Sequence, residues 1–121
     1  MKIRLLAAAA LLLTPTAALS KDRVVDCAVL SLPDKTVQYK GRCRFMPEAG
    51  GSFSLASPTG KPKLYDRIGI VSVTLTGKDT AEVSGLVIDA SGGHNSRWGE
   101  ASRSTADRAC WDGADFRVCA W

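Results

Sequence analysis

The chain has 121 residues and a formal net charge of +4, with 45% hydrophobic and 23% charged residues. This length predicts one domain. After the first twenty residues no stretch approaches the roughly 20 apolar residues that a transmembrane helix needs, which excludes a membrane-spanning protein. Lys and Arg are scattered among Asp and Glu. Nucleic-acid binders concentrate their basic residues in a patch, so no nucleic acid partner is expected.

The first twenty residues have the pattern of a secretory signal peptide. Lys2 and Arg4 precede an unbroken apolar run over residues 5–13, and residues 18–20 offer a small-residue cleavage site. We expect residues 1–20 to be cleaved and residues 21–121 to form a single β domain, periplasmic or secreted. Removing Lys2 and Arg4 lowers the net charge from +4 to about +2. Asp26 precedes the first cysteine of the remaining chain, where a lipid-attachment box has a small residue, so no lipid anchor is expected.

From residue 21 onward the sequence reads as short strands separated by turn signals. Residues 24–32 are rich in apolar and β-branched side chains and end at the turn of residues 33–35. Residues 36–45 alternate apolar and polar side chains, which is typical of a half-buried strand, and Gly41 within them predicts a bulge. One face of that strand would carry Val37, Tyr39, Cys43 and Phe45.

The middle of the chain contains the clearest hairpin. Residues 52–57 predict a strand with Phe53 and Leu55 on one face, and the prolines of residues 58–63 predict a loop. Residues 68–76 and 80–90 flank the turn Gly77-Lys78-Asp79. These two strands are expected to supply most of the core: Ile68, Ile70, Val71, Val73, Leu75, Val83, Leu86, Val87 and Ile88.

The last third of the chain contains more turn residues. Residues 91–96 (Ser-Gly-Gly-His-Asn-Ser) bury little apolar surface and predict an exposed loop. Residues 97–102 predict a short strand, and residues 104–107 a single capped helical turn. Two further strands predict a tight hairpin over residues 112–115. With seven or eight short strands, the sequence predicts an all-β fold, a small antiparallel barrel or sandwich.

Four cysteines remain after the signal peptide: Cys27, Cys43, Cys110 and Cys119. An even number of cysteines in an exported chain indicates disulfides, and four cysteines allow three pairings. The local pairing of the first two and of the last two is favoured, because each pair brackets a predicted hairpin. Zinc is the competing interpretation, but there is no Cys-x-x-Cys motif and no histidine near either pair. No metal and no cofactor are expected.

Candidates for catalysis are few. His94 is the only histidine and lies in the predicted loop, where rigid positioning is difficult. Cysteines that are oxidised offer no thiolate nucleophile. Asp112 and Asp115 resemble a calcium loop only superficially, and a cluster of turn residues explains them better. The sequence therefore predicts a binding protein rather than an enzyme.

The three tryptophans are the candidates for recognition. Core packing is the default for Trp98, Trp111 and Trp121, but Trp98 leaves the glycine-rich loop together with Arg97. Tryptophan and arginine are the residue types that most often carry binding energy at interfaces. A loop on a barrel locked by disulfides would be preorganised for insertion into a partner's cleft.

The same segment resembles the bacterial inhibitors of c-type lysozyme, the MliC/PliC group. In that family a Ser-Gly-x-x-Tyr loop is followed by a Trp and a Lys-Gly-x-x-Ala element, and both elements enter the lysozyme cleft. The matching stretches here are residues 91–94 and 98–101, with Asn95 in place of the family's Tyr and an arginine as the nearby cation. The resemblance implies a partner-binding role for Ser91, Gly92, His94, Arg97 and Trp98.

A second resemblance covers more of the chain. The stretch of residues 39–45 (Tyr-Lys-Gly-Arg-Cys-Arg-Phe) and the ending Ala-Cys-Trp…Cys-Ala-Trp are similar to small exported bacterial proteins of unknown function. This similarity implies no activity. Three hypotheses stay open: an inhibitor of a lysozyme-like cell-wall hydrolase, a carbohydrate- or peptidoglycan-binding module with exposed tryptophans, and a structural envelope protein.

Overall fold

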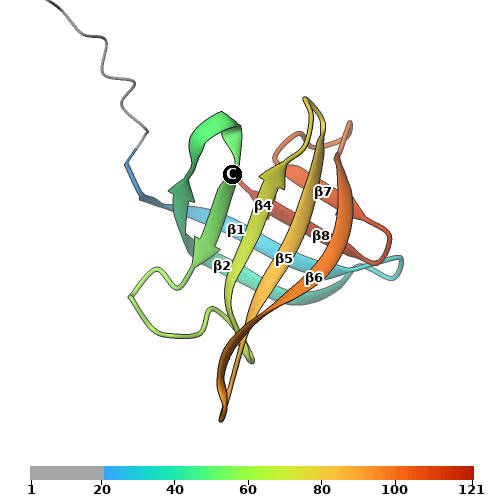
Figure 1. Cartoon of the computed structure of the whole chain (residues 1–121). Coiled ribbons are helices and arrows are strands. Elements are labelled where there is room, and N and C mark those ends of the chain that lie inside the picture. The colour runs from blue at the N-terminus through green and yellow to red at the C-terminus, as the bar shows by residue number, and fades with distance from the viewer. Residues whose placement is uncertain (1–20) are drawn as a thin grey trace, which may run out of the picture.

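Eight antiparallel strands close into a barrel in the computed structural model, which describes residues 21–121 (Figure 1). Each strand pairs with the next one along the chain, and β8 returns to pair with β1. The prediction of an all-β fold, a small antiparallel barrel or sandwich, is confirmed, and the fold is a barrel. The predicted signal peptide of residues 1–20 lies outside the described residues. The strands are β1 (Arg23–Ser31), β2 (Thr36–Pro47), β3 (Phe53–Ala56), β4 (Ile68–Leu75), β5 (Thr80–Asp89), β6 (Gly92–Arg103), β7 (Cys110–Gly113) and β8 (Phe116–Ala120).

Helical structure is nearly absent from the described part of the chain. One short 3-10 turn, η1 (Ala49–Gly51), lies between β2 and β3. Across residues 21–121 no helix has the length and apolar character needed to cross a membrane. The predicted helical turn at residues 104–107 is wrong, although the Ser104 hydroxyl accepts hydrogen bonds from the backbone N–H groups of Ala106 and Asp107 (3.2 Å each). The serine therefore organises a turn that leads directly into β7, with no helix after it.

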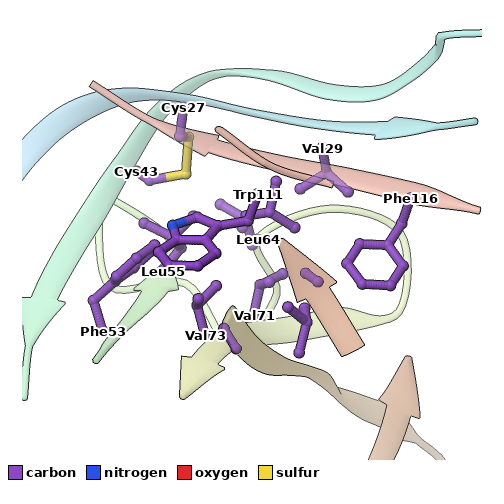
Figure 2. Packing of buried hydrophobic residues seen from close by; sticks show 14 residues of the cluster. Cys27, Val29, Cys43, Phe53, Leu55, Leu64, Val71, Val73, Trp111 and Phe116 are labelled. Atoms are coloured by element: carbon purple, nitrogen blue, oxygen red, sulfur yellow. A yellow bond between two sulfur atoms is a disulfide. The ribbon is translucent and has the colours of Figure 1, made fainter. Parts of the chain in front are cut away.

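The core fills the barrel with inward-facing side chains from alternate strand positions. Trp111 of β7 lies among side chains of β3 and β4, next to the disulfide between Cys27 and Cys43 (Figure 2). The core predicted from β4 and β5 is confirmed in part. Val71, Val73 and Val83 are fully buried, and Ile68 and Leu75 pack against them. The others are only partly buried, since consecutive apolar residues of a barrel strand cannot all face inward: Ile70, Leu86, Val87 and Ile88.

A bulge in the first hairpin changes which side chains of β2 face the core. The register shifts between Val29 and Leu30, which pair with Tyr39 and Val37, so Gln38 is an extra residue. This turns Val37 outward, where it is 53% exposed, so its predicted place on the inner face is wrong. The prediction of a bulge at Gly41 is also wrong, because the register runs continuously through it.

Both predicted disulfides are present. Cys27–Cys43 joins β1 to β2 with a Cα–Cα distance of 5.8 Å, and Cys110–Cys119 joins directly paired residues of β7 and β8 at 4.0 Å. In the chain-entropy model each short loop contributes about 3 kcal/mol to the free energy of unfolding. Two such disulfides are typical of proteins that work in oxidising compartments.

Candidate functional site

The longest hairpin of the barrel carries the predicted binding residues. β5 and β6 pair from Thr80 and Ser102 to Asp89 and Gly92, and their far ends extend beyond the barrel body, at the bottom of Figure 1. The predicted loop over residues 91–96 is therefore wrong, because residues 92–96 belong to β6 and Ser91 lies in the turn. Residues 92–96 are glycines and polar residues with low strand propensity, but they form a strand because they pair with the apolar, β-branched end of β5.

The tip of this hairpin is ordered by a carboxylate. Asp89 Oδ1 accepts hydrogen bonds from the backbone N–H (2.9 Å) and the hydroxyl (2.6 Å) of Ser91. The hydrogen bond from the Ser91 side chain, followed by that from its backbone, lowers the pKa of Asp89. His94 is 60% exposed, with Nδ1 3.6 Å from Asp89 Oδ2. The Ser91 hydroxyl proton is thus engaged within the turn, while the His94 ring reaches solvent.

Arg97 lies midway along β6, opposite Ser84 of β5, on the outer face of the sheet. We call this part of the hairpin, where it leaves the barrel body, its base. Its Nε and Nη2 atoms donate to the two carboxylate oxygens of Glu82 on β5, at 3.0 and 2.7 Å. These hydrogen bonds raise the pKa of Arg97 and lower that of Glu82. The Arg97 side chain is nevertheless 76% exposed, so the pair orients the guanidinium without contributing much stability. The Nη1 atom forms no hydrogen bond with any of residues 21–121.

Trp98 points in the opposite direction, toward the barrel interior. It is the extra residue of a bulge in β6, followed by Gly99 with φ +119°. Its ring packs edge-on against Phe116, with centroids 5.7 Å apart, and lies over Gly85, where a Cβ atom would be only 2.8 Å from Trp98 Cζ2. Trp98 is half-buried and fixes the base of the hairpin, instead of projecting beside Arg97.

Beside Arg97 and Trp98 the surface is hollowed by about 330 Å³, which we call the β6 groove. Its aromatic lining comes from Tyr65, Trp98 and Phe116, and Asp115 of the turn between β7 and β8 lies at its edge. Burial, with a smaller effect of the Asp66 charge, raises the pKa of Tyr65 to about 12. Tyr65 therefore remains a neutral hydrogen-bonding group at ordinary pH.

A second hollow of about 350 Å³, the Trp121 hollow, lies on the outer side of β1, β2 and β8. Trp121 is 50% exposed, and its indole Nε1 donates to Asp107 (3.0 Å), which lowers the pKa of that carboxyl. Lys35 and Lys40 also line this hollow and form no ion pair among residues 21–121. An aromatic face and two free cations thus occur together.

These places offer hydrogen-bonding, charged and aromatic side chains. Within residues 21–121 no three His, Cys, Asp or Glu side chains converge as metal ligands, and all four cysteines are oxidised. The sequence patterns did not indicate the β6 groove or the Trp121 hollow, because bulges and barrel closure bring their residues together. Comparisons with protein-family models, with curated proteins and with solved structures find no match for the chain.

Proposed function

We propose that the protein binds and inhibits a lysozyme-like cell-wall hydrolase, periplasmic or secreted, by presenting the β5–β6 hairpin to the partner's cleft. The observation that carries this proposal is the extension of the hairpin beyond the barrel, with exposed residues from Ser91 to Asn95. A hairpin fixed at its base and at its tip loses little conformational entropy when it enters a cleft. The sequence resemblance to c-type lysozyme inhibitors supports the same segment.

The hairpin residues divide into contacting and supporting roles. Glycosidase clefts contain paired carboxylates, and hydrogen bonds to a carboxylate are roughly twice as strong as neutral ones. His94, Asn95 and the Nη1 atom of Arg97 are the donors that would reach such a cleft. Ser91 would act through Asp89, by holding the shape of the turn, and Trp98 through Phe116, by fixing the base.

Long-range electrostatics add little to this proposal, because a net charge of about +2 does not steer the protein toward a basic lysozyme. Short-range contacts would have to supply the affinity. Inhibition should therefore depend only weakly on ionic strength.

A muramidase assay tests the proposal. The oxidised protein is titrated against a c-type lysozyme on bacterial cell walls, and stoichiometric loss of activity is expected. The double variant His94→Ala/Arg97→Ala should weaken inhibition at least about tenfold, since two charge-assisted contacts are lost. Arg42→Ala is the matched control, because Arg42 also forms an exposed ion pair, with Asp26 at 3.0 Å, on the opposite side of the barrel. No inhibition at a large molar excess, or equal effects of both variants, would refute the proposal.

The Trp121 hollow favours a second candidate function, the binding of cell-wall saccharides. The half-exposed indole of Trp121, whose orientation is fixed by Asp107, offers a face for stacking on a sugar ring. Lys35 and Lys40 could pair with carboxylate groups of the cell-wall polymer. This function predicts co-sedimentation with purified peptidoglycan that Trp121→Ala abolishes and His94→Ala leaves unchanged. Co-sedimentation that survives Trp121→Ala would exclude this hollow as the saccharide site.

A further inference from the structure

β6 has an edge that is not paired with β7 along its first nine residues. It pairs with β5 from Gly92 to Ser102 but with β7 only through Ala101, Ser102 and Arg103. From Gly92 to Glu100 no strand of residues 21–121 lies on the side of β6 that faces away from β5. Unpaired strand edges of this kind are templates for the addition of another strand.

The pairing of β5 with β4 and with β6 determines which backbone N–H and C=O groups of β6 point to the open side. The backbone N–H of Ile88 donates to the carbonyl of Arg67, on the β4 side of β5. Successive residues of a strand direct their backbone groups to opposite sides, so Val87 faces β6 and its register partner His94 faces back toward β5.

The alternation continues along β6. Ser96, the partner of Gly85, also faces β5, so Gly93, Asn95 and Arg97 direct their N–H and C=O groups to the open side. None of these three donates or accepts in the turn and loop backbone hydrogen bonds of residues 21–121.

The β6 groove adjoins this open edge. Arg97 and Trp98 form its β6 side. The far side is formed by Asp115 of the turn before β8, by Phe116 of β8, and by residues 29–31 and 38 of β1 and β2. A strand added to β6 would therefore run along the groove and place alternate side chains against Trp98, Phe116 and Tyr65. Main-chain pairing would give affinity, and the aromatic lining would select apolar side chains.

The charges of the groove indicate the sign of the ligand. Of the described residues, Arg97 and Asp115 are the charged ones that line it, and the Arg97 guanidinium is already paired with Glu82. Asp115 forms no ion pair within residues 21–121. The charge left unmatched is negative, so a cationic ligand is complementary.

We propose that the β6 edge binds an extended, basic polypeptide segment by strand addition, with alternate apolar side chains in the β6 groove. A second copy of this chain fits less well, because its own β6 segment would bring Gly93, His94, Asn95 and Ser96, none of which fills an aromatic groove. The inference does not rest on hydrolase inhibition, since it concerns the edge of β6 and not the tip of the hairpin.

The test uses the oxidised protein and a fluorescein-labelled octapeptide of alternating valine and lysine. We expect saturable binding by fluorescence anisotropy, with NMR shift changes and new exchange protection at the amides of Gly93, Asn95 and Arg97. The same peptide with aspartate for lysine should bind at least about tenfold more weakly. A valine–lysine peptide N-methylated at every backbone amide has no N–H group to donate from either edge, and it should not bind at all.

Asn95→Pro removes one N–H group from the open edge without removing a bond to β5, and proline is tolerated at such edges. It should weaken peptide binding at least about tenfold, whereas Asn95→Ala, which keeps the N–H, should change binding less than about twofold. Circular dichroism and thermal melting verify that both variants fold. Absence of binding, equal binding by Asn95→Pro, or shift changes elsewhere would overturn the proposal. A concentration-dependent dimer that Asn95→Pro disrupts, without peptide binding, would overturn it in favour of a second copy.

Discussion

Gly85 is the residue whose replacement tests most directly how the hairpin base is built. A Cβ atom at this position would lie 2.8 Å from Cζ2 of Trp98 and 3.0 Å from Cε2 and Nε1. Ordinary carbon contacts are about 3.5 Å or longer, so the indole must move by roughly 0.7 Å against Phe116. Overpacking of this kind costs about 1–3 kcal/mol. Gly85→Ala should therefore lower the melting temperature by several degrees, at about 4–8 °C per kcal/mol for a domain of this size.

A double-mutant cycle separates this effect from a loss of backbone freedom. Once Trp98→Ala has removed the indole, Gly85→Ala should no longer destabilise the protein, and it should stabilise it slightly, because alanine is favoured over glycine in a strand by roughly 0.5–1 kcal/mol. The free energies of unfolding are measured by urea denaturation of the four proteins. An equal cost of Gly85→Ala in both backgrounds would refute the packing argument.

Three further predictions concern the rest of the barrel. Replacing Cys110 and Cys119 together by serine should lower the free energy of unfolding by about 3 kcal/mol, and an unchanged denaturant midpoint would contradict this. Burial raises the pKa of Tyr65 from 10.0 to about 12. The neutral side chain should therefore contribute its full stability below pH 10, and this contribution should be lost as the pH rises through 12. Ultraviolet titration should show one tyrosine that ionises near pH 12, and Tyr65→Phe should abolish that step. Hydrogen bonds from Ser91 lower the pKa of Asp89 below its ordinary value of 3.8. The carboxylate should therefore stabilise the fold above pH 3.8, and this stability should be lost as the pH falls through the lowered pKa of the folded protein. NMR titration should give an Asp89 midpoint below 3.8, and Ser91→Ala should raise it.

Local sequence signals were sufficient for much of the fold. The turn residues 77–79 and the alternation around Phe53 and Leu55 predict strands that the structure contains. The cysteine pairing was also predictable, because each pair brackets a single hairpin and needs no knowledge of tertiary structure.

Bulges account for most of what the sequence did not reveal. A strand pattern assumes a strict period of two, and the extra residues Gln38 and Trp98 each reverse the facing of the side chains beyond them. The bulge in β2 turns Val37 outward, and the bulge in β6 aims Trp98 inward over Gly85. Strand tilt and closure of the whole barrel set such positions, and no local composition records them.

The segment of residues 91–96 shows the same limit for secondary structure. Its glycines and polar side chains have low β-propensity, which is why they predict a loop. Pairing with the end of β5 makes residues 92–96 a strand, because the long hairpin continues past the core. Neither the alternation of the strands nor the composition of residues 91–96 predicted the β6 groove, because Tyr65, Trp98 and Phe116 come from separate parts of the sequence.

The strand order of the barrel also determines when its interior can be completed during synthesis. Strands β1 to β6 pair in chain order, but the sheet they form stays open until the β7–β8 hairpin docks between β6 and β1. That hairpin brings Trp111, Phe116 and Val118 into the core, so the earlier strands expose their inner face until β7 and β8 have been made. The closing β1–β8 contact spans nearly the whole chain and carries the largest loop-closure entropy of any pairing. The nascent chain therefore reaches its native packing only after β8 has been synthesised.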